Sequence, residues 1–316
     1  MVRSKFQHLS KKNKDSTGFF QKLKNFLFGT ELSKRVSTAL LMFAFAFAVF
    51  SVGFFAVCPV AIILALLMIY EYDRMFIAPL PSDPNIKGRV PSKEALSYFH
   101  KKYTFDSVLT AGLLCAFCFN IRSLNIQLFL LCTLAVAFLS IVISLINKRK
   151  HWFLESLPSV YIGLGIFCLI SLYFRESWFS ILFFFVITIA TDSGAFFFGR
   201  TIGGPKLCPR ISPKKTWSGF LGGIFSAVVF VKLLFLVFPM GLDDNKFISE
   251  FSSILSVIVL SISAQIGDLF ESHLKRTSGV KDSSQFIPGH GGFLDRFDSI
   301  IFIFDILSIY YLFKNY

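Results

Sequence analysis

Long apolar runs separated by short polar segments dominate the chain. A helix of about 20 apolar residues spans the roughly 30 Å hydrocarbon core of a bilayer, because each residue adds about 1.5 Å. Pro59 separates the first two runs, which together are too long for a single crossing. The pattern predicts an all-α, polytopic membrane protein of about nine transmembrane helices. The runs cover residues 36–57, 59–77, 105–120, 125–146, 157–174, 177–198, 217–239, 251–270 and 297–313.

Composition supports this fold class. The chain is 54% hydrophobic and only 16% charged, and it contains 42 phenylalanines. Soluble domains are typically about 25% charged. The net charge of +13 is high enough to suggest a nucleic-acid partner. The positions of the cations along the chain decide whether this charge indicates nucleic-acid binding or the topology of a membrane protein.

The cations follow the topology of a membrane protein. With the N-terminus in the cytoplasm, the cytoplasmic segments contain 27 Lys and Arg residues and the opposite side contains 4. Such an excess is typical of cytoplasmic loops. We therefore expect a cytoplasmic N-terminus, a C-terminus on the other side, and no nucleic-acid partner.

The chain divides into three predicted regions. Residues 1–35 carry nine Lys and Arg residues. Within them, residues 19–28 fit either a short amphipathic helix in the headgroup layer or a disordered basic tail. Residues 36–174 form an N-terminal transmembrane region, and residues 175–316 form a C-terminal region that contains the predicted chemistry.

Polar residues of unusual placement lie at the predicted cytoplasmic ends of the last four spans. Asp192 lies about one and a half turns before the end of its span. A carboxylate inside a membrane is costly and is by default a functional hypothesis. The alternative is a structural ion pair with Arg200.

A second group precedes the span at 217–239. Ser212 and Pro213 resemble a helix N-cap and a first-turn proline, followed by Lys214, Lys215 and Thr216. Free backbone N–H groups and two lysines at a helix N-terminus predict an anion site. Ordinary positive-inside charge is the simpler explanation of the lysines, but it does not explain the surrounding Gly, Pro and Ser residues.

Carboxylates occur in pairs around the last polar loop. Asp268 and Glu271 share a helical face, as do Asp295 and Asp298. Magnesium usually takes one or two protein carboxylates and completes its shell with water and phosphate. Asp268 and Asp295 are therefore the predicted metal ligands. The remaining carboxylates, Glu271, Asp282 and Asp298, are equally suited to pair with Lys275, Arg276 and Arg296.

The loop itself combines cations with glycines that let the backbone approach a ligand. His290 lies in a Pro-Gly-His-Gly-Gly turn and either contacts phosphate or is an ordinary polar residue. Residues 272–298 read SHLKRTSGVKDSSQFIPGHGGFLDRFD. This stretch resembles, without a gap, the C-terminal signature of the phosphatidate cytidylyltransferase (CDP-diacylglycerol synthase) family. The resemblance continues upstream through GDLFES, SPKKTW and TDSGAFFFGR and covers about residues 175–313.

The chain departs from the family pattern at three positions. The family often has Glu where Ser218 stands, Tyr where Phe196 stands and Lys where Gly204 stands. No role is therefore assigned to these three residues.

The resemblance implies transfer of CMP from CTP to phosphatidic acid, giving CDP-diacylglycerol and pyrophosphate, with Mg²⁺ and room for more than one cation. We also expect a bacterial cytoplasmic (inner) membrane, and the distribution of Lys and Arg predicts that the active site faces the cytoplasm. The predicted catalytic residues are Asp268, Lys281, Asp282, His290, Asp295 and Arg296. The predicted substrate-binding residues are Asp192, Ser212, Pro213, Lys214, Lys215, Thr216, Lys275, Arg276, Gly291 and Gly292.

Three questions stay open at this point. Another CTP-using membrane enzyme, such as a polyprenol kinase-like protein, would transfer the γ-phosphate to an alcohol. A transporter or channel would place charges along a path through the membrane, whereas here most gather at one face. The first four spans are candidates either for a homodimer surface or for support of the site.

Overall fold

We describe the fold from a computed structural model in which residues 41, 44–77, 93–119, 126–176, 178–237, 246–287 and 291–313 are placed. These residues are almost entirely helical, with one two-stranded hairpin. The elements are α3 (Phe54–Ile77), α4 (Lys93–Phe119), α5 (Ile126–Ile146), η2 (Leu154–Ser156), α6 (Pro158–Arg175), α7 (Trp178–Thr201), β1 (Lys206–Cys208), β2 (Ser212–Thr216), α8 (Trp217–Val237), α10 (Lys246–Phe251), α11 (Ile254–Ser278) and α12 (Leu294–Phe313).

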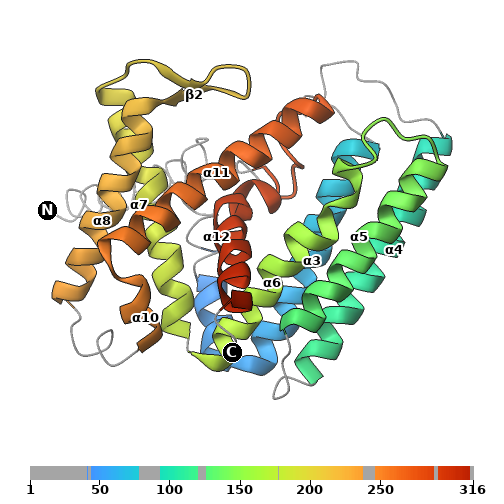
Figure 1. The fold of residues 1–316 in the computed structure, drawn as a ribbon, viewed down its shortest axis with the longest axis horizontal. Coiled ribbons are helices and arrows are strands. Elements are labelled where there is room, and N and C mark those ends of the chain that lie inside the picture. The colour runs from blue at the N-terminus through green and yellow to red at the C-terminus, as the bar shows by residue number, and fades with distance from the viewer. Residues whose placement is uncertain are drawn as a thin grey trace, which may run out of the picture.

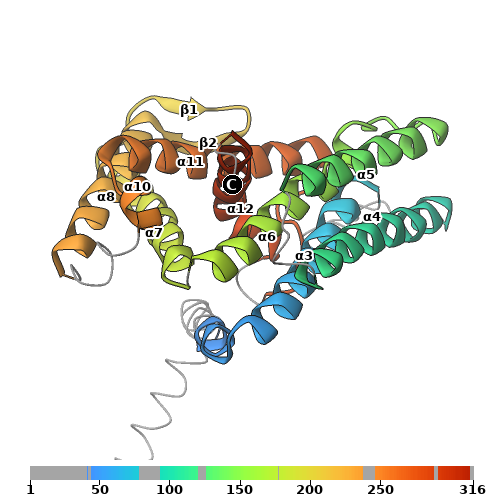
Figure 2. The same ribbon diagram turned by 60° about the horizontal axis from the view of Figure 1, so that its bottom comes forward.

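The helices form two groups joined by a central layer (Figure 1). Helices α3, α4 and α5 lie together on one side, and α7 and α8 lie on the other. Helices α6, α11 and α12 occupy the space between the two groups. The β1–β2 hairpin covers the ends of α7 and α8 and runs along α11 (Figure 2).

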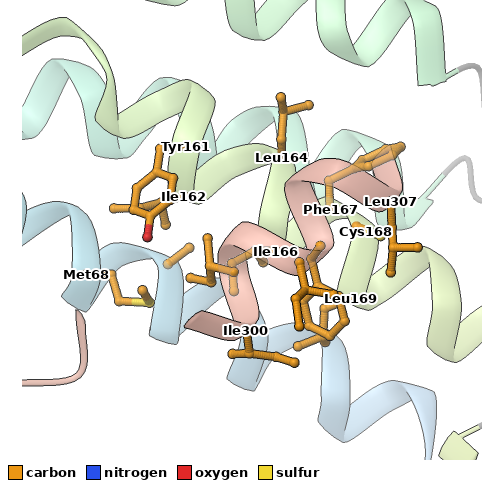
Figure 3. Close-up of a cluster of buried hydrophobic side chains, with 14 of the residues drawn as sticks. Met68, Tyr161, Ile162, Leu164, Ile166, Phe167, Cys168, Leu169, Ile300 and Leu307 are labelled. Atoms are coloured by element: carbon orange, nitrogen blue, oxygen red, sulfur yellow. The ribbon is translucent and has the colours of Figure 1, made fainter. Parts of the chain in front are cut away.

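A buried apolar core ties the central layer to the N-terminal group. Met68 of α3, Ile162 and Phe167 of α6, and Ile300 and Leu307 of α12 lie in one cluster (Figure 3). Each of these side chains is at most 2% exposed. Helix α12 therefore packs against the N-terminal half of the chain as well as against α11.

Small residues allow close helix packing beside the polar groups. A Cβ added at Gly194 of α7 would lie 2.1 Å from the Ser226 Oγ atom of α8. A Cβ at Gly267 of α11 would lie 2.8 Å from the Asp298 carbonyl oxygen of α12. Any residue with a Cβ atom would clash at these two positions, so glycine is what allows the helices to pack this closely. These close contacts lie beside Asp192, Asp268 and Asp298 in the chain.

Among the residues that the structure describes, six helices are long and apolar enough to cross a membrane, which confirms an all-α polytopic membrane protein. The predicted number of nine is not confirmed within the described residues, and the orientation of the N-terminus remains a prediction. Residues 1–35 and most of the predicted span at 36–57 lie outside the described residues. The six helices are Phe54–Ile77, Gln127–Ile146, Leu154–Arg175, Trp178–Thr201, Trp217–Val237 and Ile254–Ser278.

Two predicted boundaries are wrong. Pro59 lies inside α3, and the chain instead turns at Gly53, whose φ is +100°. Proline near a helix start removes one intrahelical hydrogen bond, whereas a positive φ interrupts the helix outright. The predicted span at 105–120 is the second half of α4, which begins at Lys93. Lys102 and Asp106 pair within this helix and neutralise each other, so the helix continues through a charged segment.

Candidate functional site

The segment Ser212–Thr216 is a β-strand, so its predicted role as a helix start is wrong. Cys208 pairs with Ser212 and Lys206 pairs with Thr216 in the antiparallel hairpin. Helix α8 begins only at Trp217, and the Thr216 hydroxyl accepts a hydrogen bond from the Gly219 N–H at 3.1 Å. Thr216 therefore provides the N-terminal cap that the sequence pattern assigned to Ser212.

Lys215 fastens this strand to α11. Its Nζ atom lies 2.8 Å from the Asp268 Oδ2 atom and 3.5 Å from the Gln265 carbonyl oxygen. A second attachment comes from Arg276, whose Nε atom donates to the Ile211 carbonyl oxygen at 3.3 Å. Pro213 and Lys214, by contrast, are exposed. In the hairpin, Lys215 thus contacts Asp268 of α11, whereas Lys214 faces solvent.

Three carboxyl groups from three helices lie close enough to influence one another electrostatically, and one of them, Asp268, pairs with Lys215. Asp192 of α7, Asp268 of α11 and Asp298 of α12 interact electrostatically with one another. Asp298 is buried at 8% exposure, whereas the Asp268 side chain is 37% exposed. The Asp298 carbonyl oxygen also accepts a hydrogen bond from the Tyr161 hydroxyl at 3.2 Å. The cluster gathers three carboxyl groups, and Asp268 leaves part of it open to a cation.

The donor chemistry of this cluster fits magnesium. Hard carboxylate oxygens are the protein ligands that Mg²⁺ prefers, and it needs only one or two of them. Asp268 is partly open, and Asp192 is exposed. Within the described residues, no group of three or more His, Cys, Asp or Glu side chains is arranged so that it could hold a metal ion. Water and substrate phosphate would therefore have to supply most of the ligands.

Asp295, the other predicted metal ligand, accepts hydrogen bonds from α11 and from the loop that precedes α12. Its oxygens accept hydrogen bonds from the Lys275 Nζ atom at 2.8 Å, the Gly292 N–H at 2.8 Å and the Ser283 hydroxyl at 2.9 Å. Lys275 also pairs with the buried Glu271. Asp268 and Asp295 thus contact different lysines, and their joint role as metal ligands stays a prediction.

The remaining predicted residues surround this loop. Gly291 has a φ of +83°, and its carbonyl oxygen accepts a hydrogen bond from the Ile287 N–H at 2.9 Å. Asp282 is half-buried, while Lys281 and Arg296 are exposed. His290 lies outside the described residues.

Sequence reasoning missed Glu71, which comes from α3 and reaches the same loop. Its carboxylate accepts hydrogen bonds from the Ser284 hydroxyl at 2.5 Å and from the Leu294 N–H at 2.7 Å. The side chain is completely buried. In the sequence, Glu71 is an acidic residue near the end of the apolar run at 59–77. It was not predicted as a site residue because the predicted site comprised only the last four spans.

A second polar cluster in the N-terminal half was also missed. Lys102 and Asp106 of α4 form a buried ion pair, and the Ser140 hydroxyl of α5 donates to the Asp106 Oδ1 atom at 2.5 Å. Asp73 of α3 lies 3.9 Å from the Lys102 Nζ atom. All four residues are at most 2% exposed. The i, i+4 spacing of Lys102 and Asp106 was visible in the sequence.

The fold and these contacts define a helical membrane protein with a charged site where α7, α11, α12 and the β-hairpin meet. A model of the cytidylyltransferase family matches residues 33–314. The chain belongs to this family, which confirms the family predicted from the signature.

Named relatives agree with the family match. The chain is 41% identical over 194 residues to a protein named phosphatidate cytidylyltransferase from Staphylococcus haemolyticus, with 58% of this chain and 69% of the relative covered. It is 38% identical over 180 residues to one from Staphylococcus saprophyticus, with 56% and 66% covered. The relative from Staphylococcus aureus strain COL is 40% identical over 181 residues, again with 56% and 66% covered. The chain thus spans about two thirds of the length of these relatives.

Proposed function

We propose that this protein is a membrane nucleotidyltransferase that transfers CMP from CTP to phosphatidic acid. An oxygen of the lipid phosphate attacks the α-phosphorus of CTP, and the bond between that phosphorus and the oxygen bridging to the β-phosphate breaks. The products are CDP-diacylglycerol, a phospholipid precursor, and pyrophosphate. The observation that carries the proposal is the cluster of Lys215, Asp192, Asp268 and Asp298 at the meeting point of three helices. Family membership supports the same reaction.

The cluster suits a reaction whose main difficulty is charge. A phosphate monoester carries about −1.5 to −2 charge near neutral pH, so a strong general base is not required. Positioning and electrostatic stabilisation are what phosphoryl-type transfers need most. Lys215 supplies a cation held between α11 and the hairpin, and Lys214 and Arg276 offer exposed cations beside it.

Magnesium is the cofactor we propose for this site. Asp268 would hold it, together with Asp192, Asp298 or the predicted partner Asp295. The bound ion would neutralise phosphate charge. The chain itself orients the carboxylates, since Gly267 lets α11 and α12 approach closely beside Asp268.

We place the enzyme in a bacterial cytoplasmic membrane with this site facing the cytoplasm, where CTP is available. The excess of Lys and Arg on one side of the predicted topology supports this orientation. The acyl chains of the substrate would stay in the bilayer while its phosphate reaches the polar cluster. A homodimer stays a prediction.

An assay with position-specific labels tests the proposal. The purified full-length protein is incubated with phosphatidic acid, Mg²⁺ and CTP labelled either at the α- or at the γ-phosphate. We expect the α-label in the lipid product and one pyrophosphate released for each lipid modified, with activity lost on chelation. Transfer of the γ-label to lipid would instead identify a kinase and overturn the proposal.

A further inference from the structure

We infer that Glu71 is a positioning residue that attaches the loop between α11 and α12, together with the start of α12, to the N-terminal half of the protein. This inference rests on the proposed function only in assigning the loop to an active site. The structural part of it stands on four hydrogen bonds. The Glu71 Oε1 atom accepts from the Ser284 hydroxyl and the Phe293 N–H, and the Oε2 atom accepts from the Ser283 hydroxyl and the Leu294 N–H.

Two of these donors belong to the beginning of a helix. Leu294 is the first residue of α12, and Phe293 precedes it. The N–H groups at a helix start have no intrahelical acceptor and are usually capped by a nearby side chain. Here the Phe293 N–H lies 3.0 Å and the Leu294 N–H 2.7 Å from an oxygen of Glu71. A negative charge at this end of a helix is also electrostatically favourable.

The other two donors belong to the loop. The Ser284 hydroxyl contacts Glu71 at 2.5 Å, and the Ser283 hydroxyl lies 3.2 Å from Glu71 and 2.9 Å from Asp295. A hydroxyl carries one proton, so Ser283 joins the two carboxylates by donating to one of them at a time. Through Asp295 the connection extends to Lys275 of α11. Glu71 therefore contacts the loop, α12 and, indirectly, α11.

The fit around Glu71 leaves little space. A Cβ added at Gly292 would lie 2.7 Å from each oxygen of the Glu71 carboxylate and 2.0 Å from the Ser283 hydroxyl. Any larger residue at position 292 would push these groups apart. Glycine at this position is thus explained by the approach of the loop backbone to Glu71.

These contacts make Glu71 a positioning residue and not a catalytic one. The side chain is fully buried, and protein groups occupy both of its oxygens. Asp298 lies one turn after Leu294 on α12, so the position of the start of α12 sets where Asp298 meets Asp268. A displaced start of α12 would move Asp298 within the carboxylate cluster.

The chemistry requires a carboxylate at position 71. Four N–H and O–H donors point to the two oxygens, and a carboxylate only accepts. In Glu71→Gln an NH₂ group would face two donors, although the size of the side chain is unchanged. In Glu71→Asp the charge is kept, but the carboxylate is one methylene farther from its partners. We expect both variants to loosen the loop, the Gln variant more strongly.

Hydrogen–deuterium exchange of the full-length protein tests the inference without reference to activity. For Glu71→Gln we expect exchange of the peptide covering residues 283–294 to become at least tenfold faster. The matched control is Glu155→Gln, which removes another buried carboxylate of the N-terminal half, one that pairs with Arg149 at 3.1 Å. This control should leave exchange of that peptide within twofold of the parent protein. Unchanged exchange in Glu71→Gln would overturn the inference.

Kinetics then separate this inference from the proposed function. We expect Glu71→Gln to lower kcat at least tenfold with a smaller change in KM for CTP, while Glu155→Gln keeps both. A parent protein that fails to transfer CMP refutes the proposed function, but faster exchange in Glu71→Gln would still support the positioning role. If Glu71→Gln does not fold, Ser284→Ala removes one of the four donors to Glu71, together with the acceptor of the Phe286 N–H. The readout is therefore exchange of the Phe293 and Leu294 N–H groups, which donate directly to Glu71. Faster exchange of these two groups in that variant supports the inference, and unchanged exchange contradicts it.

Discussion

Two polar clusters of this protein, one around Lys102 and one around Lys215, use the same residue types in opposite ways. In the N-terminal half, Lys102 is at most 2% exposed and lies among Asp73, Asp106 and Ser140. In the C-terminal half, Lys215 is 24% exposed and its partner Asp268 is 37% exposed. In each cluster a lysine connects its own element to others: Lys102 links α4 to α3 and α5, and Lys215 links β2 to α11. The clusters differ in whether a ligand from outside can reach the charges.

This difference indicates which cluster can take part in chemistry. Breaking a buried ion pair leaves an uncompensated charge, so a buried pair constrains the packing of helices and cannot exchange partners cheaply. A partly exposed pair can exchange its partner for a phosphate or a cation from solvent. We therefore interpret the Lys102 cluster as structural and the Lys215–Asp268 cluster as the reactive site.

The largest effect is expected from Lys102→Met, which breaks the buried cluster. Removing one partner of a buried ion pair typically costs about 3–5 kcal/mol of stability. We expect the thermal unfolding midpoint to fall sharply, while kcat and KM of the molecules that remain folded are unchanged. Lys101→Met is the matched control, because Lys101 is exposed on the same helix and should change the free energy of unfolding by less than about 0.5 kcal/mol. A loss of kcat without a loss of stability would refute the structural interpretation.

The reactive site should show the reverse pattern in Asp268→Asn. The amide removes a charge from the cluster while keeping the shape of the side chain. We expect kcat/KM to fall by about 100–1000-fold, the size typical of losing one preorganised electrostatic group. The stability cost should stay below about 1 kcal/mol, because this ion pair is partly solvated.

Steady-state assays and thermal unfolding of Asp268→Asn measure both quantities. Glu94→Gln, an exposed acidic residue of α4, serves as the control for a lost negative charge. Activity of Asp268→Asn within twofold of the parent protein would remove Asp268 from the site.

The smallest effect is expected at Lys214, and it refines the boundary of the reactive site. Lys214 is exposed, whereas its neighbour Lys215 pairs with Asp268. An exposed charge contributes roughly 0.2–1 kcal/mol, so Lys214→Met should raise the KM for CTP only about 2–5-fold. The difference from the parent protein should shrink at high salt, because exposed charges are screened. Equal losses in Lys214→Met and Lys215→Met would show that burial does not distinguish the two lysines.

Hydropathy predicted most helices closely, because each apolar run must be long enough to cross the bilayer. The runs at 125–146 and 157–174 correspond to α5 (126–146) and α6 (158–175) within one residue. The hairpin at Ser212–Thr216 was not predictable in the same way, since a Ser-Pro pair before an apolar run is typical of a helix start. Its strand pairing depends on residues 206–208.

The site was predictable only in part for a related reason. The signature supplied most of the residues around the loop, because they are close together in the sequence. The sequence marks Glu71 only as an acidic residue in an apolar run and does not reveal its role, since its partners Ser284 and Leu294 lie more than 200 residues away. Side chains that act through such distant contacts become visible only once the helices are packed.

The distance between Glu71 and Leu294 also has a consequence for biogenesis. The two residues are 223 positions apart, and a ribosome makes the chain from its N-terminus. The carboxylate that caps α12 is thus synthesised and inserted long before the helix that needs it. Helix α12 therefore completes its first turn against a partner that already exists, and a nascent chain that stops before residue 294 lacks the Leu294 N–H that donates to Glu71.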